Sequence, residues 1–293
     1  MKPAPFDYVR PNSLAEVCEV LSADEDARII AGGQTLIPML AMRLARPSRL
    51  VDVVRLPELR GIRLEKETLV IGAVTRQVEV ERSELAQEKL PLLSKALPWV
   101  GHPPTRNRGT VGGSIANADP SAEIPLVAVT LGAEMEISNV DGRSWVSADE
   151  FFIGAMLTSV MPGDCVCGVR FPVWSHRRLG TGFREVSARQ SDFAFVAAAA
   201  QAALDEDGRC VAVALGLGGV GDRAQSIDAS WLVGQDPSSV DLKDLVRSQV
   251  AHIDANSDLH ATADYRRRVA AVLLVRALED AIVEARNADG AVR

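Results

Sequence analysis

The spacing of apolar positions changes several times along the first part of the chain. Residues 12–21 carry apolar side chains at helical spacing after a serine followed three positions later by a glutamate, which predicts a capped amphipathic helix. Residues 27–31 form a continuous apolar run typical of a buried strand, and residues 35–46 return to helical spacing. Residues 50–53 predict a second strand. Residues 1–56 therefore predict a small βαβ-like unit.

A different pattern follows, in which short strands alternate with helical stretches. It predicts a mixed α+β unit over residues 57–174. The expected strands are 69–73, 133–137 and 165–171, and the expected helices are 90–100 and 124–131.

The last part of the chain follows a proline-bounded, charged stretch, residues 172–178, which we take as a linker. An alanine-rich apolar run at 193–204 comes first, then an alternating strand pattern at 210–215 and a long amphipathic helix at 265–286. Residues 178–293 are thus expected to form helices on a small antiparallel sheet. The predicted fold class is α+β.

Composition narrows the possible partners. The 293 residues are 47% apolar and carry a formal net charge of −7. An acidic balance without a basic stripe argues against nucleic acid as a partner. No window of about 18 apolar residues predicts a membrane span, and the first residues lack the apolar core of a secretory signal. We therefore expect a cytoplasmic protein.

Cysteine and histidine patterns give no metal site. The four cysteines include no C-x-x-C pair, and the four histidines include no H-x-x-x-H pair. Cys165 and Cys167 lie two apart in an apolar run, where buried strand packing is favoured over metal or redox use. We expect no metal bound by the chain itself.

Three groups of glycines could approach a phosphate, because a backbone comes close to a diphosphate only where side chains are absent. The first, Gly32-Gly33, follows a predicted strand and precedes a predicted helix. The second, Gly112-Gly113, is flanked by hydroxyl and amide side chains. Each of these two, taken alone, is also compatible with an ordinary turn.

The third group, Gly216 to Gly221, matches G-x-G-x-x-G and follows a predicted strand. The residues that follow the glycines do not favour the start of a helix. The acidic residue that a dinucleotide-binding motif needs could only be Asp236, which lies in a turn rather than at the end of a second strand. A glycine-rich strand end with close backbone packing is favoured over a Rossmann loop.

Together, the first two groups carry a family resemblance. Ala31-Gly32-Gly33-Gln34-Thr35-Leu36-Ile37-Pro38 resembles the signature A-G-G-x-[ST]-L-x-P. The run from Arg106 to Pro125 resembles R-N-x-G-T-x-G-G-S-x-x-x-x-D-P-x-x-[DE]-x-P. Both signatures are those of the FAD-binding medium subunit of molybdenum hydroxylases, such as carbon monoxide dehydrogenase, quinoline oxidoreductase and the flavin domain of xanthine dehydrogenase. The resemblance covers nearly the whole chain.

The resemblance implies two α+β subdomains that cradle FAD, of the vanillyl-alcohol-oxidase-like (PCMH) type, followed by a C-terminal domain. In that family the first loop wraps the FAD pyrophosphate with backbone N–H groups. By match, this role falls to Ala31, Gly32, Gly33, Gln34, Thr35 and Leu36.

The second motif is implied to reach the phosphate or ribityl oxygens. Thr110 and Ser114 would hydrogen-bond these oxygens, and Gly112 and Gly113 would permit their close approach. A carboxylate on the flavin hydroxyls is matched by Glu123, with Asp119 as the rival; an Asp-Pro turn cap is the other interpretation of Asp119.

Around the flavin ring the resemblance implies contacts from Gly101, His102 and Val166. Some relatives carry a flavin-contacting lysine where this chain has Arg184 and Glu185, so which of the two, if either, touches the flavin stays open. Arginine would stabilise an anionic reduced flavin, whereas an ionised glutamate would disfavour it.

The resemblance implies an oxidoreductase subunit with no residue that breaks substrate bonds. Electrons would come from [2Fe–2S] clusters on a small partner, pass through FAD, and leave to an external acceptor. A large partner would hold the molybdenum cofactor and the substrate, and the assembly would be a dimer of heterotrimers. A stand-alone flavoprotein oxidoreductase and a flavin-free assembly protein of the same fold are the alternatives. The substrate class stays open among N-heteroaromatics, carbon monoxide, purines and aldehydes.

Overall fold

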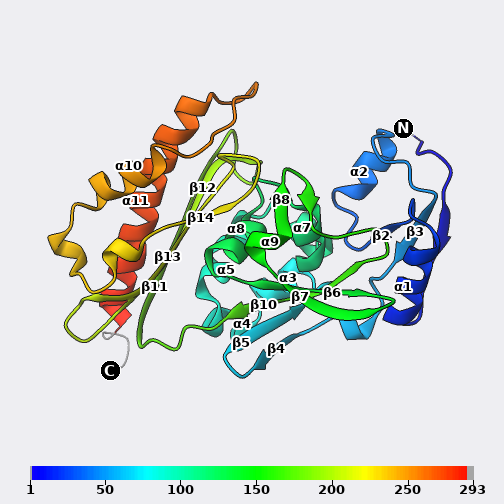
Figure 1. Cartoon of the computed structure of the whole chain (residues 1–293), viewed down its shortest axis with the longest axis horizontal. Coiled ribbons are helices and arrows are strands. Elements are labelled where there is room, and N and C mark those ends of the chain that lie inside the picture. Colours follow the sequence, from blue (N-terminus) through cyan, green and yellow to red (C-terminus); the bar gives the residue numbers. More distant parts are fainter. Residues whose placement is uncertain (1, 289–293) are drawn as a thin grey trace.

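The computed structural model describes residues 2–288, and these form three lobes in a row (Figure 1). The N-terminal lobe holds a three-stranded parallel sheet in the order β1-β3-β2. Its strands are joined through helices, so the βαβ-like unit predicted for this region is present. The elements are β1 (Asp7–Val9), α1 (Leu14–Ala23), β2 (Arg28–Ile30), α2 (Leu36–Ala41) and β3 (Arg49–Asp52).

The helix predicted at 12–21 is α1. Its N-cap is Ser13, whose hydroxyl accepts a hydrogen bond of 3.2 Å from the Glu16 N–H. Apolar side chains of α1, including Val17, are buried against the sheet. Helix α2 is shorter than the predicted 35–46, because the chain leaves the helix after Ala41 and Arg43 adopts a φ of +61°.

The middle lobe is built on a five-stranded antiparallel sheet in the order β4-β5-β10-β6-β7. Helices α5, α7 and α8 share one hydrophobic core with this sheet. The elements are a 3₁₀ turn (Pro57–Leu59), β4 (Ile62–Glu65), β5 (Thr68–Gly72), α3 (Gln77–Glu81), α4 (Glu84–Lys89), α5 (Pro91–Ala96), a 3₁₀ turn (Leu97–Trp99), α6 (Pro103–Arg108), α7 (Val111–Asn117), α8 (Glu123–Thr130), β6 (Glu134–Asn139), β7 (Gly142–Ser147), α9 (Ala148–Phe151), β8 (Phe152–Gly154), β9 (Leu157–Thr158) and β10 (Cys165–Pro172).

The strands and helices predicted in this region exist, with shifted ends. The helix expected at 90–100 is α5 followed by a 3₁₀ turn. Cys165 and Cys167 are free and buried in β10, as the strand-packing interpretation requires.

The C-terminal lobe is an antiparallel sheet in the order β11-β12-β13-β14 with helices α10 and α11 outside it (Figure 1). The fold class is thus mixed α and β, with helices on an antiparallel sheet at this end, as predicted. The elements are β11 (Arg178–Ser187), β12 (Ala194–Leu204), β13 (Cys210–Gly218), β14 (Gln225–Ile227), 3₁₀ turns (Ser230–Leu232 and Pro237–Ser239), α10 (Leu242–Val250) and α11 (Ala263–Asn287).

The alanine-rich run is strand β12, which is buried on both faces. Helix α11 contacts one side of the sheet, and α5 and α8 contact the other. Small residues let α11 lie very close: a Cβ at Gly180 or Gly182 of β11 would collide with the α11 backbone at Ala281 or Ala277. The many alanines in β12 are explained by the limited space, since a sheet between two helical layers has little room for larger side chains.

The G-x-G-x-x-G match belongs to this sheet. Gly216 and Gly218 lie in β13, which is antiparallel to β12 and β14, and the next element after the glycines is strand β14 rather than a helix. A dinucleotide loop needs a helix directly after the glycines. The packing interpretation of Gly216 to Gly221 is confirmed.

Residues 2–288 are the part of the chain to which the next two findings apply. None of its helices is long and apolar enough to cross a membrane. No group of three or more histidine, cysteine, aspartate or glutamate side chains is placed to hold a metal ion.

Candidate cofactor-binding site

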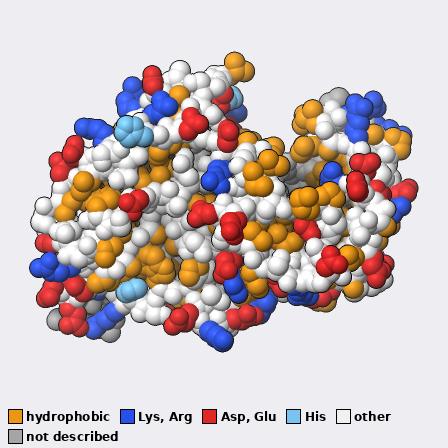
Figure 2. Space-filling view, in the orientation of Figure 1, with side chains coloured by type: hydrophobic (Ala, Val, Ile, Leu, Met, Phe, Trp, Pro, Cys, Tyr) orange, Lys and Arg blue, Asp and Glu red, His pale blue; other side chains and the backbone are white. Residues whose placement is uncertain are grey.

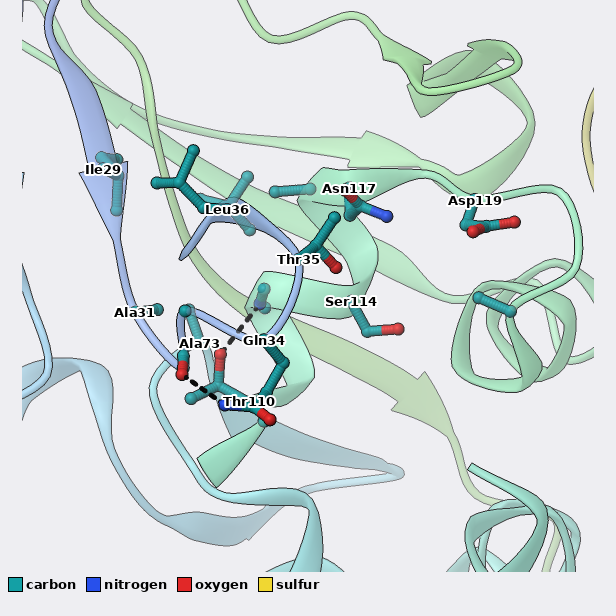
Figure 3. A pocket seen from close by; sticks show the side chains of 18 of the residues that line it. Ile29, Ala31, Gln34, Thr35, Leu36, Ala73, Thr110, Ser114, Asn117 and Asp119 are labelled. Atoms are coloured by element: carbon teal, nitrogen blue, oxygen red, sulfur yellow. Dashed lines mark hydrogen bonds between the residues drawn. The ribbon is translucent and has the colours of Figure 1, made fainter. Parts of the chain in front are cut away.

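A cavity of about 790 Å³ opens between the N-terminal and middle lobes. This volume lies in the upper part of the range for small-molecule and cofactor sites. The loop with Gln34 and Thr35 faces helix α7, with Ser114 and Asn117, across the cavity (Figure 3). The predicted site residues that line it are Ala31, Gly32, Gly33, Gln34, Thr35, Leu36, Gly101, His102, Thr110, Gly112, Gly113, Ser114, Asp119, Glu123 and Val166.

The first loop presents a row of free backbone donors. Among the described residues, no hydrogen-bond acceptor is bonded to the backbone N–H groups of residues 32–36. The loop is shaped by Gly33, whose φ is +70°, and by Gln34, whose side-chain amide donates to the Gly32 carbonyl at 3.1 Å. Consecutive unsatisfied N–H groups form a concave anion site, because their dipoles converge.

The two motifs touch through their backbones. A Cβ on Gly32 would lie 2.5 Å from the Arg108 carbonyl oxygen, and a Cβ on Gly112 would collide with Ala73 of the middle lobe. Glycine is required at both positions, because no real Cβ comes that close to another heavy atom. The motifs therefore form one wall, although 67 residues of sequence, 39–105, lie between them.

Helix α7 presents side-chain hydrogen-bonding groups to the cavity, because its first backbone N–H groups are already bonded. Thr110 caps it by accepting a 3.1 Å hydrogen bond from Gly113 N–H, and the Val111 and Gly112 N–H groups donate to Thr75 and Ala73 carbonyls. The Ser114 hydroxyl and the Asn117 amide have no hydrogen-bond partner within residues 2–288. A polyol or phosphate ligand would find its partners here in side-chain hydroxyl and amide groups.

The far end of the cavity is acidic. Asp119 accepts a 2.9 Å hydrogen bond from the Ser121 N–H, which matches an Asp-Pro turn cap, and burial raises the pKa of its carboxyl. Glu123 begins α8 with only 8% of its surface exposed, and burial raises its pKa to about 7. A carboxyl that is partly protonated near neutral pH can both donate and accept hydrogen bonds.

Arg184 and Glu185 point to opposite sides of β11, and neither lines the cavity. Arg184 makes a two-bond ion pair with Asp280 of α11, at 2.6 and 2.9 Å. Both carboxyl oxygens of Glu185 are buried without a hydrogen-bond partner. Burial, with a further contribution from the Glu123 charge, raises the pKa of Glu185 to about 8.

Sequence reasoning missed other cavity residues. Asn117 lies inside the second motif, so its hydrophilic side chain was a usable signal. Met161 and Phe193 come from segments without a motif, and they are 66% and 71% exposed at the cavity. Arg28, a cation near the first loop, begins strand β2, which precedes the glycines. Met161, Phe193 and Arg28 come together only in the folded chain, so no local sequence pattern predicts that they line one cavity.

The cavity thus suits a long ligand with an anionic segment, a hydroxylated chain and an apolar part. The free amides can bind the anion, the side chains from Thr110 to Asn117 can bind hydroxyls, and Val166 with Phe193 offers apolar contact. FAD has this composition, and the residues present fit it.

Comparison with known proteins also indicates an FAD-binding chain. Residues 4–174 match the family "FAD binding domain in molybdopterin dehydrogenase", and residues 181–281 match "CO dehydrogenase flavoprotein C-terminal domain". The chain is 37% identical over 98% of its length to the alpha subunit of the 6-hydroxypseudooxynicotine dehydrogenase complex of Paenarthrobacter nicotinovorans, covering 97% of that protein. It is 34% identical over 98% of its length to the carbon monoxide dehydrogenase medium chain of Afipia carboxidovorans, covering 100% of that protein.

The fold is also similar to that of a solved structure. A chain in the crystal structure of quinoline 2-oxidoreductase from Pseudomonas putida 86 superposes with a TM-score of 0.91 at 37% identity, covering 97% of this chain and 99% of that one. The motifs, the cavity and the full-length similarity agree, and the chain belongs to the family of FAD-binding medium subunits of molybdenum hydroxylases.

Proposed function

We propose that the chain is the FAD-carrying electron-transfer subunit of a heterotrimeric molybdenum hydroxylase. It takes electrons from [2Fe–2S] clusters of a small partner subunit and passes them to an external acceptor. A large partner subunit holds the molybdenum cofactor and oxidises the substrate. The observation that carries the proposal is the row of free amides at residues 32–36 in a cavity of cofactor size.

The names of the relatives support a substrate site outside this chain. Proteins named for 6-hydroxypseudooxynicotine, caffeine and carbon monoxide resemble it over 95% or more of its length. These three compounds differ greatly in size and polarity. A chain that stays alike over its whole length is therefore a poor candidate for the substrate pocket, and a good one for a shared electron-transfer step.

The first loop would hold the pyrophosphate of FAD. The N–H groups of residues 32–36 would donate to its oxygens, and Gly33 gives the loop its curvature. Backbone donors suit this protein, because local amide dipoles hold an anion even where the net charge is −7.

The rest of the cofactor follows the cavity wall. Thr110 and Ser114 offer hydroxyls to phosphate or ribityl oxygens, and Glu123 offers a carboxyl to flavin hydroxyls. Gly101, His102 and Val166 would contact the ring, which would supply reversible electron storage when it is bound. Of the two β11 candidates, Glu185 lies within the electrostatic influence of the cavity residue Glu123, whereas Arg184 is held by Asp280.

A partner surface surrounds the cavity. Exposed apolar side chains occur on two segments that also contribute residues to the cavity lining. They are Ile37, Met42 and Leu44 in and after α2, and Ile153, Met156 and Leu157 in the β8–β9 hairpin. Hydrophobic side chains face the notch between the N-terminal lobe and the centre of the molecule (Figure 2). Apolar side chains gathered in one place mark protein interaction sites. We place the iron–sulfur subunit here, because electron transfer requires its cluster to come close to the flavin.

The decisive experiment compares the lone chain with the complex formed with its partner subunits. The proposal expects flavin absorbance and no iron in the lone chain, and iron and molybdenum only in the complex. Iron or molybdenum bound by the lone chain would overturn it, as would substrate oxidation without partners. A chain that never binds flavin would instead be an assembly protein. The mass of the complex tests the dimer of heterotrimers, and cell fractionation tests the expected cytoplasmic location.

A further inference from the structure

A second concave surface lies at the other end of the molecule. Helices α10 and α11 lie side by side on the outer face of the C-terminal sheet (Figure 1), and a groove of about 620 Å³ runs between them. None of its lining residues lines the FAD cavity. We call it the α10–α11 groove.

The floor of the groove is apolar. Helix α11 already buries one full face against the sheet, including Leu274 and Leu278. Beside that face it carries Ala271, Val272 and Val275 along the groove. The Val272 side chain is 45% exposed, whereas Val275 is 6% exposed and Ala271 packs against the same core. A surface helix normally buries its apolar positions against its own domain. Within residues 2–288 the Val272 side chain of α11 has no such cover.

The rim of the groove is basic. Lys243 and Arg247 of α10 and Arg268 and Arg276 of α11 line it, and none of these four makes an ion pair with a described residue. Arg267 is the fifth cation, and the only acidic side chain among the lining residues is Glu279. In a chain with 39 acidic and 32 basic residues, such a local excess of positive charge is unusual.

Both walls repeat at helical spacing. Arg268, Val272, Val275 and Arg276 lie along one line of α11, and Lys243, Arg247, Val250 and Ala251 lie along one line of α10. The groove is therefore a straight channel with an apolar floor and cations along its sides. An amphipathic helix fits such a channel with its apolar face down.

We propose that the α10–α11 groove binds an acidic amphipathic helix of another subunit in the complex. Apolar side chains at positions i, i+3 and i+7 would cover Val272 and the floor beside it. Flanking Asp or Glu side chains would pair with the four rim cations, of which Arg268 also lies over the Tyr265 ring. Charge complementarity determines this choice, because a neutral or basic helix would leave these cations facing like charge or none. The inference rests on the proposed function only in that the chain works within a complex.

Charge reversal tests the pairing in the assembled complex. In Arg276→Glu and in the double variant R268E/R276E, we expect the partner protein that co-purifies with this chain to fall about tenfold or more at physiological salt. Lys66→Glu, at an exposed turn of the middle lobe, is the matched control and keeps full assembly. Unchanged assembly of the double variant would overturn the proposal.

Flavin content separates this proposal from the function proposed above. Both variants should bind flavin as the unaltered chain does, since the groove shares no residue with the cavity. If the unaltered chain lacks flavin while the charge reversals still abolish assembly, the electron-transfer function fails and the groove proposal stands.

A photo-cross-linker identifies the occupant directly. Benzoylphenylalanine placed at Val272 in the complex should cross-link to a helical segment of a partner subunit that carries Asp or Glu beside apolar residues. A cross-link to a second copy of this chain, to a non-acidic segment, or to nothing would overturn the proposal.

Discussion

The cavity loops and the C-terminal sheet both depend on glycine. Gly32 and Gly112 of the loops pack closely, as the glycines of the sheet do, but an added side chain at Gly113 would meet different atoms. At Gly180, Gly182 and Gly216 an added side chain would collide with a packed helix of the same chain. At Gly113 it would meet only the Thr110 side chain, beside the open cavity. The first set of glycines brings two elements together, and Gly113 leaves room beside the ligand space.

This difference explains why a pattern match alone misleads. The G-x-G-x-x-G run has the better match to a nucleotide motif, yet its glycines pack against α8 and the β12 end. The shorter Gly32-Gly33 run is followed by a helix and by amides without acceptors. Substitutions should therefore separate a stability role from a binding role.

The largest effect is expected at Gly182. In Gly182→Val the new side chain would overlap the Ala277 carbonyl of α11, and backbone cannot yield as a side-chain tip can. We expect a loss of about 4 kcal/mol or more in the free energy of unfolding, or no folded protein. Urea denaturation measures it. Gly154→Ala, where nothing lies within 4 Å, is the control and should change stability by less than about 1 kcal/mol. Equal losses in the two variants would refute the packing role.

Gly33→Val should act on binding. Gly33 has a φ of +70° and shapes the loop whose amides face the cavity. We expect flavin content to fall about tenfold or more while the chain stays folded, as judged by circular dichroism and flavin absorbance. Gly132→Val, at a φ of +64° with no neighbour within 4 Å, carries the same backbone strain away from the cavity. Equal flavin loss in the control would show that strain, rather than the loop, is responsible.

The sequence predicted these loops because their geometry is encoded locally. A strand, two glycines and a helix start lie within ten residues, and α7 follows its own cap at Thr110. Strand β12 was harder to predict than these loops, because a run of alanines shows no two-residue alternation of apolar and polar side chains. Its extended form results from α11 and α8 pressing on both faces.

Side-chain partners across lobes could not be predicted in the same way. Arg184 and Glu185 are neighbours in sequence and point apart only because β11 is a strand. That Arg184 meets Asp280, and that Glu185 meets the charge of Glu123, depends on how α11 and α8 dock. No spacing in the sequence carries this information.

Glu185 tests the junction of the two regions, since it extends from the C-terminal sheet toward the middle lobe. Its pKa is raised to about 8 by burial and by Glu123, whose own surroundings include Asp119 and Arg106. A raised carboxyl pKa stabilises the fold at low pH, and that contribution is lost as the pH rises through the folded value. The unaltered chain should therefore lose about 1–3 kcal/mol of stability between pH 6 and pH 9.

Glu185→Gln should remove most of that loss, because an amide does not ionise. Urea denaturation from pH 6 to pH 9 checks it, with Glu67→Gln at an exposed site as the control that leaves the slope unchanged. A slope in Glu185→Gln as steep as in the unaltered chain would show that Glu185 is not the group that titrates.

The smallest effect is expected at Ser114, and it sharpens the comparison most. Its hydroxyl has no partner in the described chain and faces the cavity, so Ser114→Ala removes a ligand contact without unsatisfying any protein group. We expect FAD affinity to fall about fivefold, equal to about 1 kcal/mol, with an unchanged unfolding free energy. Titration of the flavin-free chain with FAD measures it, and Ser144→Ala in exposed β7 is the control. A change in stability without a change in affinity would assign Ser114 to packing, and the cavity wall would then resemble the C-terminal sheet.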